Sequence, residues 1–151
     1  MLRKKGFTLI ELLIVISVIS ILVGIALPRF RGMQDEGNIA KSKAELRTLQ
    51  TAVESYCIHT GAYPAALTNL TSATPNITGS VLPKDPFNGG DGCGGPANYG
   101  YVRGGTNNGY YVIYSVGPNG NGSATISGDA VSETNGSSCI YISNIGTDSQ
   151  P

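Results

Sequence analysis

The sequence predicts an α+β fold, in which one long N-terminal helix packs on a small antiparallel sheet of three to four strands. Two observations lead to this prediction. An unbroken apolar segment at residues 7–27 is followed by an amphipathic helical pattern that continues to about residue 60. In the last third of the chain, short segments rich in aromatic and β-branched residues alternate with glycine-rich connections, as strands and turns do. A chain of 151 residues has room for one such domain.

Charge and composition limit the class of function. The chain has ten basic and ten acidic residues, and only 13% of its residues are charged. Three of the basic residues, Arg3, Lys4 and Lys5, precede the apolar segment. The remainder is therefore net acidic and has no basic patch of the kind that binds nucleic acid. Its polar residues are mostly Gly, Ser, Thr and Asn, which is typical of an exported, loop-rich β domain.

The apolar segment is long enough to cross a membrane once. Phe7–Leu27 contains 21 residues and spans roughly 32 Å as a helix, against about 30 Å for the hydrocarbon core of a bilayer. The basic residues before it are expected to keep that end in the cytoplasm and to place everything after Leu27 outside the inner membrane. The alternative is a cleavable secretory signal, whose apolar region is normally about 7–15 residues. The greater length and an internal carboxylate favour the membrane span.

Glu11 is the unusual residue of this segment. An acidic side chain at mid-bilayer costs roughly 2.5–3.5 kcal/mol, so such residues are usually paired and functional. Cleavage between Gly6 and Phe7 would create a new α-amino group at Phe7. A neighbouring copy displaced along the helix axis would bring that cation to Glu11. The alternative is a protonated glutamic acid without a function near the lipid headgroups.

The stretch KKGFTLIELLIVI, residues 4–16, closely resembles the type III signal sequence of bacterial type IV pilins and of the pseudopilins of type II secretion. The resemblance implies that a membrane-embedded prepilin peptidase cuts after Gly6 and methylates the new N-terminal Phe7. It also implies that Glu11 pairs with the N-terminus of a neighbour during filament assembly. Pro28 falls where this family has a helix-bending proline, whereas Ser20 stands where many pilins have glycine.

The second half of the predicted helix is amphipathic. Its apolar residues are spaced 7, 3, 4 and 3 apart, which places them on one face: Ile39, Leu46, Leu49, Val53 and Tyr56. The helix is expected to end near Thr60, because Gly61 suits the position after a helix and Pro64 follows. The expected organisation is a cleaved leader at 1–6, a transmembrane and filament-core half at 7–28, an amphipathic half at 29–60 and a globular head at 61–151.

The head is expected to consist of a loop region at 61–98, with one short helical turn around Ala65–Leu70, and of a β-sheet region at 99–151. The predicted strands are Tyr99–Arg103, Tyr110–Val116 and Ser138–Ser143. The sequence GGTNNG between the first two is a hairpin connection, rich in residues that tolerate positive φ. The sequence GPNGNGSATISGD after the second strand has too much glycine for regular structure over its full length.

Three short stretches, TGAYP, LPKDPF and YYVIYSVGPNG, resemble the major pseudopilin, or G subunit, of type II secretion systems. That resemblance implies a calcium ion in the loop after the last of these strands, held by carboxylates and carbonyls. The loop offers four side-chain oxygen donors, Asn119, Asn121, Asp129 and Glu133, of which Asp129 is the best candidate. The other interpretation, which the small number of carboxylates favours, is that Asp129 and Glu133 are solvated loop residues.

The three cysteines, Cys57, Cys93 and Cys139, all lie on the exported side, where disulfides persist. They permit three single bridges. Cys93–Cys139 is favoured, because it would fasten a glycine-rich loop to the last strand, whereas Cys57 suits a buried position at the helix end. A disulfide bounding the C-terminal region is common in type IV pilins and unusual in G subunits.

No Ser-His-Asp order, phosphate loop or pair of carboxylates predicts catalysis, so no enzymatic activity is expected. The resemblance implies a structural subunit of a helical filament, best matched by the major pseudopilin of a type II secretion system. The alternative is a surface type IV pilin for adhesion, motility or DNA uptake, and only DNA uptake would involve nucleic acid. A third interpretation is a membrane-anchored domain that binds a ligand through its glycine-rich loops.

The partners that this resemblance implies are further copies of the chain, the prepilin peptidase, an inner-membrane assembly platform and minor pilins. Before assembly the chain is expected to cross the inner membrane once. Afterwards it would belong to a periplasmic or extracellular filament.

Overall fold

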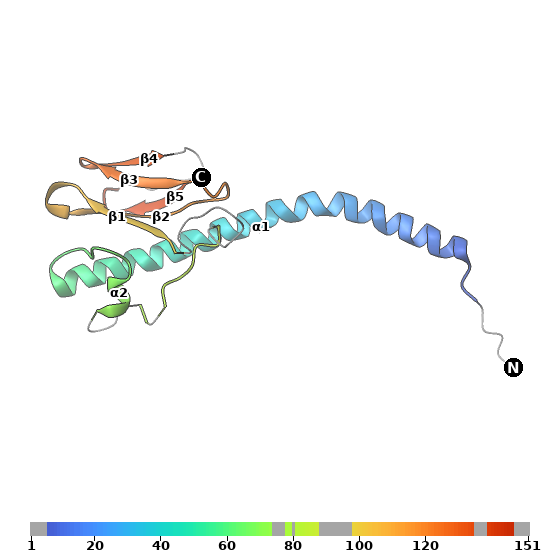
Figure 1. The fold of residues 1–151 in the computed structure, drawn as a ribbon, viewed down its shortest axis with the longest axis horizontal. Coiled ribbons are helices and arrows are strands. Elements are labelled where there is room, and N and C mark those ends of the chain that lie inside the picture. The colour runs from blue at the N-terminus through green and yellow to red at the C-terminus, as the bar shows by residue number, and fades with distance from the viewer. Residues whose placement is uncertain (1–5, 74–77, 80, 88–97, 135–138, 147–151) are drawn as a thin grey trace. The chain divides into compact units, whose positions relative to one another are not determined.

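The computed structural model describes residues 6–73, 78–79, 81–87, 98–134 and 139–146 (Figure 1). By its internal contacts the chain forms two compact units, residues 1–36 and residues 37–151. The elements, in chain order, are helix α1 (Leu9–Thr60), helix α2 (Asn69–Ser72), strand β1 (Gly100–Gly104), the 3-10 turn η1 (Thr106–Asn108), strand β2 (Tyr110–Ser115), strand β3 (Ser123–Ser127), strand β4 (Ala130–Thr134) and strand β5 (Ile140–Ser143).

Helix α1 begins and ends with recognisable signals. The Thr8 hydroxyl oxygen accepts a hydrogen bond from the backbone N–H of Glu11 at 3.3 Å, which satisfies one donor that the first helical turn leaves open. At the other end Gly61 has a φ of 80°, and its N–H donates to the Cys57 carbonyl at 2.8 Å. Glycine adopts this left-handed conformation without steric cost, so the helix stops at Thr60 as predicted.

Strands β1, β2 and β5 form an antiparallel sheet with β2 in the centre. The register pairs Val102 with Val112 on one side of β2 and Ile113 with Ile142 on the other. The three predicted strands lie within about two residues of the observed ones. Their first connection turns through η1, where Asn107 and Asn108 have φ values of 57° and 55°. Asparagine tolerates this region better than most residues, which is why GGTNNG predicted a turn.

The main core lies between the second half of α1 and the sheet. Its buried members are Leu46, Leu49, Ala52, Val53, Leu67, Leu70, Tyr99, Tyr111, Ile113, Ile140 and Ile142. The predicted apolar face of the helix is confirmed, because its three central residues are buried and Ile39 and Tyr56 pack at its margin. The predicted turn around Ala65–Leu70 is also present and continues into α2, with i→i+3 hydrogen bonds from Asn69 and Leu70.

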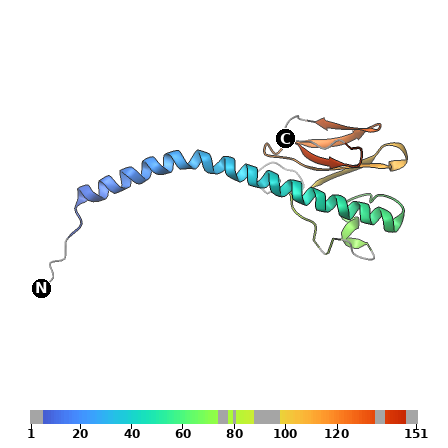
Figure 2. The same ribbon diagram turned by 180° about the vertical axis from the view of Figure 1, so that it is seen from behind.

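The sequence prediction missed the hairpin formed by β3 and β4, which pairs Ala124 with Glu133 and Ile126 with Val131. It lies on the face of the sheet opposite α1 (Figures 1 and 2). There it contributes to a second apolar cluster, made by Val102, Val112, Tyr114, Ala124, Ile126, Val131, Cys139 and Tyr141. Local preference in these short, serine-rich and threonine-rich segments is weak. The strands form because packing on the sheet outweighs that preference.

Candidate assembly site

The first unit exposes almost all of its apolar surface. Large apolar side chains from Phe7 to Met33 are exposed on every side of α1, with Phe7 itself 71% exposed. The helix is long and apolar enough to cross a membrane, and its most apolar stretch is not buried against the described parts of the chain. A helix that is apolar all round requires lipid or other protein around it. This half of α1 is therefore built to be covered by something outside the chain.

Glu11 lies in the first turn of this exposed helix. Besides its backbone bond to Thr8, its carboxylate oxygen Oε2 accepts a hydrogen bond from the Thr8 hydroxyl at 3.4 Å. Thr8 and Glu11 thus have the spacing of a capping box, a threonine followed three residues later by glutamate. Sequence reasoning missed this local role, although the T-x-x-E spacing was visible. A carboxylate has about four acceptor positions, so Thr8 leaves most of its capacity open.

The predicted cleavage position lies just before the helix. Gly6 and Phe7 are exposed and have no helical or strand structure, and α1 starts only at Leu9. A Cβ atom added at Gly6 would meet no atom within 4 Å. The peptide bond between them is therefore exposed in a segment without regular secondary structure, where a peptidase can reach it.

Within the apolar half of α1, two serine side chains form hydrogen bonds with the backbone of the same helix. The Ser17 and Ser20 hydroxyls donate to the carbonyls of Ile14 and Ile16 at 2.7 and 2.8 Å. Such internal hydrogen bonds let serine lie in apolar surroundings. The helical backbone continues through Gly24 and Pro28 without interruption. The bend predicted at Pro28 stays a prediction.

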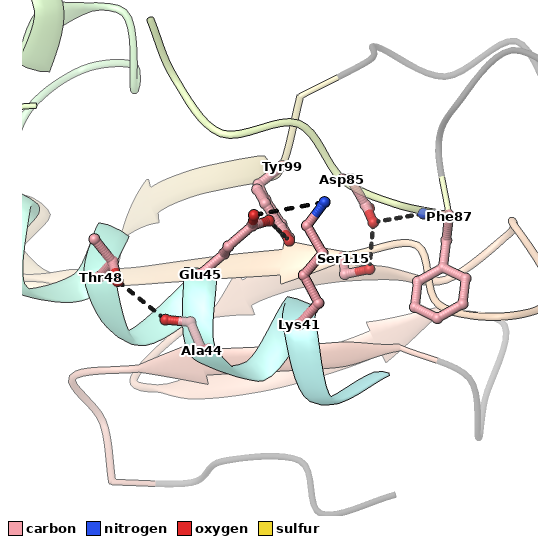
Figure 3. Close-up of polar contacts among 8 residues, drawn as sticks. All are labelled: Lys41, Ala44, Glu45, Thr48, Asp85, Phe87, Tyr99 and Ser115. Atoms are coloured by element: carbon pink, nitrogen blue, oxygen red, sulfur yellow. Dashed lines mark hydrogen bonds and ion pairs between the residues drawn. The ribbon is translucent and has the colours of Figure 1, made fainter. Parts of the chain in front are cut away.

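In the head, partly buried polar contacts join α1 to Tyr99, directly before β1, and to Tyr111 in β2. The Tyr99 hydroxyl donates to Oε2 of Glu45 at 2.5 Å, and Lys41 lies 3.9 Å from the other oxygen of the same carboxylate (Figure 3). Further along α1, Glu54 accepts a hydrogen bond from the Tyr111 hydroxyl at 2.7 Å. These contacts fix both the distance and the rotation of the helix against the strands.

Asp85 is a buried carboxylate that holds the long loop following α2. Asp85 is only 2% exposed. It accepts hydrogen bonds from the Ser115 hydroxyl at 2.8 Å and from the Phe87 N–H at 3.1 Å (Figure 3). A third hydrogen bond comes from the Val116 N–H at 2.9 Å. The sequence LPKDPF suggested a family resemblance but not this role, because Ser115, at the end of β2, is 30 residues away from Asp85.

Burial of the tyrosines changes their acidity. The pKa of Tyr99 is raised above its ordinary value, first by burial and then by its hydrogen bond to Glu45. Burial likewise raises the pKa of Tyr111, and its hydrogen bond to Glu54 adds to the effect. A phenolate at either position would lie beside a carboxylate in a low-dielectric core, so both hydroxyls stay protonated donors.

The structure places the predicted calcium ligands Asn119 and Asp129 at opposite ends of β3. Asn119 lies in the turn before β3, closed by a hydrogen bond from the Gly120 N–H to the Gly117 carbonyl at 2.9 Å. Asp129 lies in the turn between β3 and β4, where its Oδ1 accepts a 3.5 Å hydrogen bond from the Thr106 hydroxyl. Glu133 is exposed near the end of β4, and Asn121 precedes β3. Across the described ranges, no three His, Cys, Asp or Glu side chains gather to hold a metal.

The predicted disulfide falls partly outside the described residues, because Cys93 is not among them. Cys139 is buried beside the β3–β4 hairpin, immediately before β5. Cys57 is half-buried in the last turns of α1, where the sequence suggested a small apolar residue. The bridge between Cys93 and Cys139 stays a prediction.

An exposed apolar helix that continues into a helix-on-sheet head defines the class of pilin-like filament subunits, and comparisons with known families agree. Residues 1–27 match the prokaryotic N-terminal methylation motif. Residues 29–133, more than two thirds of the chain, match the model of type II secretion system (T2SS), protein G. The chain belongs to this family and is a pseudopilin, a subunit of a secretion filament.

Individual relatives agree with this family. The type II secretion system core protein G of Pseudomonas aeruginosa is 28% identical over 125 residues, covering 78% of this chain and 86% of the relative. The protein of the same name from Klebsiella pneumoniae is 28% identical over 131 residues, again 78% of this chain. By contrast, the type IV narrow pilus major component PilA5 of Thermus thermophilus is 52% identical over 50 residues, only 33% of this chain. A search of solved structures gave no significant match.

The extent of these matches separates the two filament classes. The pilin of Thermus thermophilus matches 33% of this chain, whereas the secretion protein of Pseudomonas aeruginosa matches 78% and the protein G family model covers residues 29–133. The surface-pilin alternative therefore fits less well. The relatives are structural pilins and pseudopilins rather than enzymes.

Proposed function

We propose that the chain is cut between Gly6 and Phe7 by a prepilin peptidase, that the new N-terminus at Phe7 is methylated, and that the mature chain is the major subunit of a type II secretion filament. The observation that carries the proposal is the exposed, non-helical position of the Gly6–Phe7 bond directly before a helix whose described large apolar side chains, up to Met33, are exposed. The match of residues 1–27 to the methylation motif supports the same cleavage.

Glu11 is the assembly residue in this proposal. Its backbone and carboxylate are anchored by Thr8, so the carboxylate is held at the start of the helix with acceptor positions to spare. The α-amino group of a neighbouring mature Phe7 fills one of them when that neighbour is offset along the helix axis. Lipid and protein interior are both apolar, so leaving the bilayer gives the helix little free energy. Specificity therefore depends on packing and on this ion pair.

The proposed location follows from the same helix. Before assembly α1 spans the inner membrane with the basic leader in the cytoplasm, as the charge distribution favours. After processing, an inner-membrane assembly platform and minor pilins incorporate the subunit into a short periplasmic filament. The proposal assigns the chain a structural role without catalysis, a bound cofactor or nucleic acid.

Mass spectrometry of the mature chain tests the processing step. A chain that begins with N-methylated Phe7 is expected from a host that carries the peptidase, and a chain that begins at Met1 from a host that lacks it. A mature chain that begins elsewhere would overturn the proposed cleavage.

Three variants test the assembly step. Glu11→Ala is expected to insert normally into the membrane but to give at least about tenfold fewer filaments, because an ion pair in apolar surroundings is worth more than 1.4 kcal/mol. Glu11→Gln keeps the length of the side chain and should show the same loss. Thr8→Val removes the capping hydroxyl but leaves the carboxylate, so its filament yield should stay close to that of the unmodified chain.

Two results would contradict the ion pair. One is a normal filament yield from Glu11→Gln. The other is an equal loss from Thr8→Val, which would mean that Glu11 acts only by starting the helix. Shearing intact cells tests the location separately, because the subunit should stay in the envelope while the sheared fraction lacks it.

A further inference from the structure

The connection between β2 and β5 is the segment in which the family resemblance implies a calcium ion. In this chain it is largely a β-hairpin rather than an open loop, with β3 and β4 paired over five residue pairs from Ser123–Thr134 to Ser127–Ala130. Whether the segment can bind calcium therefore depends on how far apart its oxygen donors lie.

The donors do not fit one ion. Asp129 directly precedes β4 and Glu133 is near its end, so their Cα atoms lie about 13 Å apart at roughly 3.4 Å per residue. Calcium needs six to eight oxygen ligands at about 2.3–2.6 Å. The two carboxylates of the segment consequently cannot share an ion. Asn119 lies in a turn at the other end of β3 from Asp129 and therefore cannot join it. Glu133 pairs with Ala124 near the Asn119 turn, so an ion at that end would have only one carboxylate of the segment as a ligand. Calcium affinity depends on the number of charged ligands, so such a site would bind the ion weakly.

Apolar packing holds the hairpin in place. Ala124 is 0% exposed and packs with Val112, which is 0% exposed in the central strand β2. The hairpin approaches closely because glycine occupies the facing positions. A Cβ atom at Gly104 would lie 3.3 Å from Cβ of Ile126, and one at Gly122 would lie 2.9 Å from the Cα atom of Cys139. A side chain at Gly104 would require Ile126 to move by a few tenths of an ångström, and a side chain at Gly122 would require the backbone near Val116 and Cys139 to shift.

The start of the connection is held by the chain's own carboxylate. Asp85 binds the Ser115 hydroxyl and the Val116 N–H, the last residue of β2 and the first after it. The next turn is closed by a hydrogen bond from the Gly122 N–H to the Val116 carbonyl at 2.9 Å. Both ends of the segment 116–122 are thus fixed by hydrogen bonds within the chain.

We propose that the β3–β4 hairpin, packed on the outer face of the sheet, and Asp85, bound to the end of β2, together replace calcium as the support of this connection, so that the head is equally stable with and without the ion. The proposal concerns the head alone and does not depend on where the filament acts.

Thermal unfolding of the full-length chain in detergent tests the proposal. The chain has eight tyrosines and no tryptophan, and several tyrosines are buried in the head, so near-ultraviolet circular dichroism follows the head rather than the apolar helix. The same melting temperature is expected in millimolar calcium and in excess EDTA. A site saturated about 100-fold above its dissociation constant would instead raise the melting temperature by roughly 10 °C.

Two matched variants on β3 test the hairpin as a support. Ala124→Asp places a charge in the outer cluster and should lower the melting temperature by more than 10 °C, since an unpaired buried charge is strongly unfavourable. Thr125→Asp, on the exposed face of the same strand, is the control and should leave it within about 2 °C.

Two outcomes would overturn the proposal. The first is a saturable rise of the melting temperature with calcium that Asp129→Asn abolishes, which would show a metal site in the hairpin turn. The second is an equal effect of Ala124→Asp and Thr125→Asp, which would show that the packed face of the hairpin does not support the head.

Discussion

At the scale of single residues, three carboxylates of this chain have different tasks. Glu11 is exposed and can accept further hydrogen bonds from a partner, whereas Glu45 and Asp85 accept hydrogen bonds from other residues of the head. The sequence alone distinguishes Glu11, because an acidic residue in an apolar segment needs an explanation. Asp85 could not be recognised in the same way, since its partners are brought to it only by the folded chain.

Asp85→Asn is expected to lower the free energy of unfolding of the head by about 1–3 kcal/mol. The amide keeps one acceptor oxygen, but its NH2 group would face a backbone N–H that now lacks an acceptor. Chemical denaturation measures the change. Asp129→Asn is the matched control, because Asp129 is exposed and makes one long hydrogen bond at 3.5 Å. Equal stability of both variants would contradict the role given to Asp85.

The head should lose stability at alkaline pH. In the unfolded chain tyrosine ionises near its ordinary pKa of about 10, while the folded state raises the pKa of Tyr99 and Tyr111. The stabilisation is therefore complete below pH 10 and is lost as the pH rises further, since the unfolded state releases protons that the folded state keeps. Denaturation at a series of pH values measures this slope, and Tyr111→Phe should make it shallower. Stability that stays constant above pH 10 would contradict the expectation.

At the scale of elements, the helix and the central strands could be predicted because their signals are local. The length of α1, its apolar face and the glycine after its last residue can all be recognised from local patterns in the sequence. Strands β1 and β2 are rich in tyrosine and valine and are separated by a turn sequence. The β3–β4 hairpin could not be predicted in this way. Ala124 and Ile126 become strand residues by covering Val112 and its neighbours, which no local pattern reveals.

The apolar face of α1 gives a direct test at this scale. Leu49 is 1% exposed in the main core, so Leu49→Ala should lower the free energy of unfolding by about 2–5 kcal/mol. Thr48, its neighbour on the exposed side of the helix, should tolerate alanine with a change within about 0.5 kcal/mol. The same denaturation experiment measures both. Similar losses for the two variants would mean that the helix rotates against the sheet.

At the scale of the whole molecule, the two units handle apolar surface differently. The unit at 37–151 buries its apolar residues in two clusters, one on each face of the sheet. The unit at 1–36 leaves its apolar residues uncovered and depends on lipid or on other subunits. The family membership therefore explains what the isolated chain leaves unexplained, since a filament supplies the missing cover.

The central position of β2 has a consequence for how the head opens. β2 is hydrogen-bonded to a strand on each side, and its residues contribute to the apolar clusters on both faces of the sheet. Its amide protons can therefore reach deuterated solvent only when the whole head comes apart. In hydrogen–deuterium exchange Val112 and Ile113 should be the last to take up deuterium, long after the edge strand β4. The exchange rate at these two positions would then report how often the head unfolds completely. It can be measured both in free subunits and in assembled filaments.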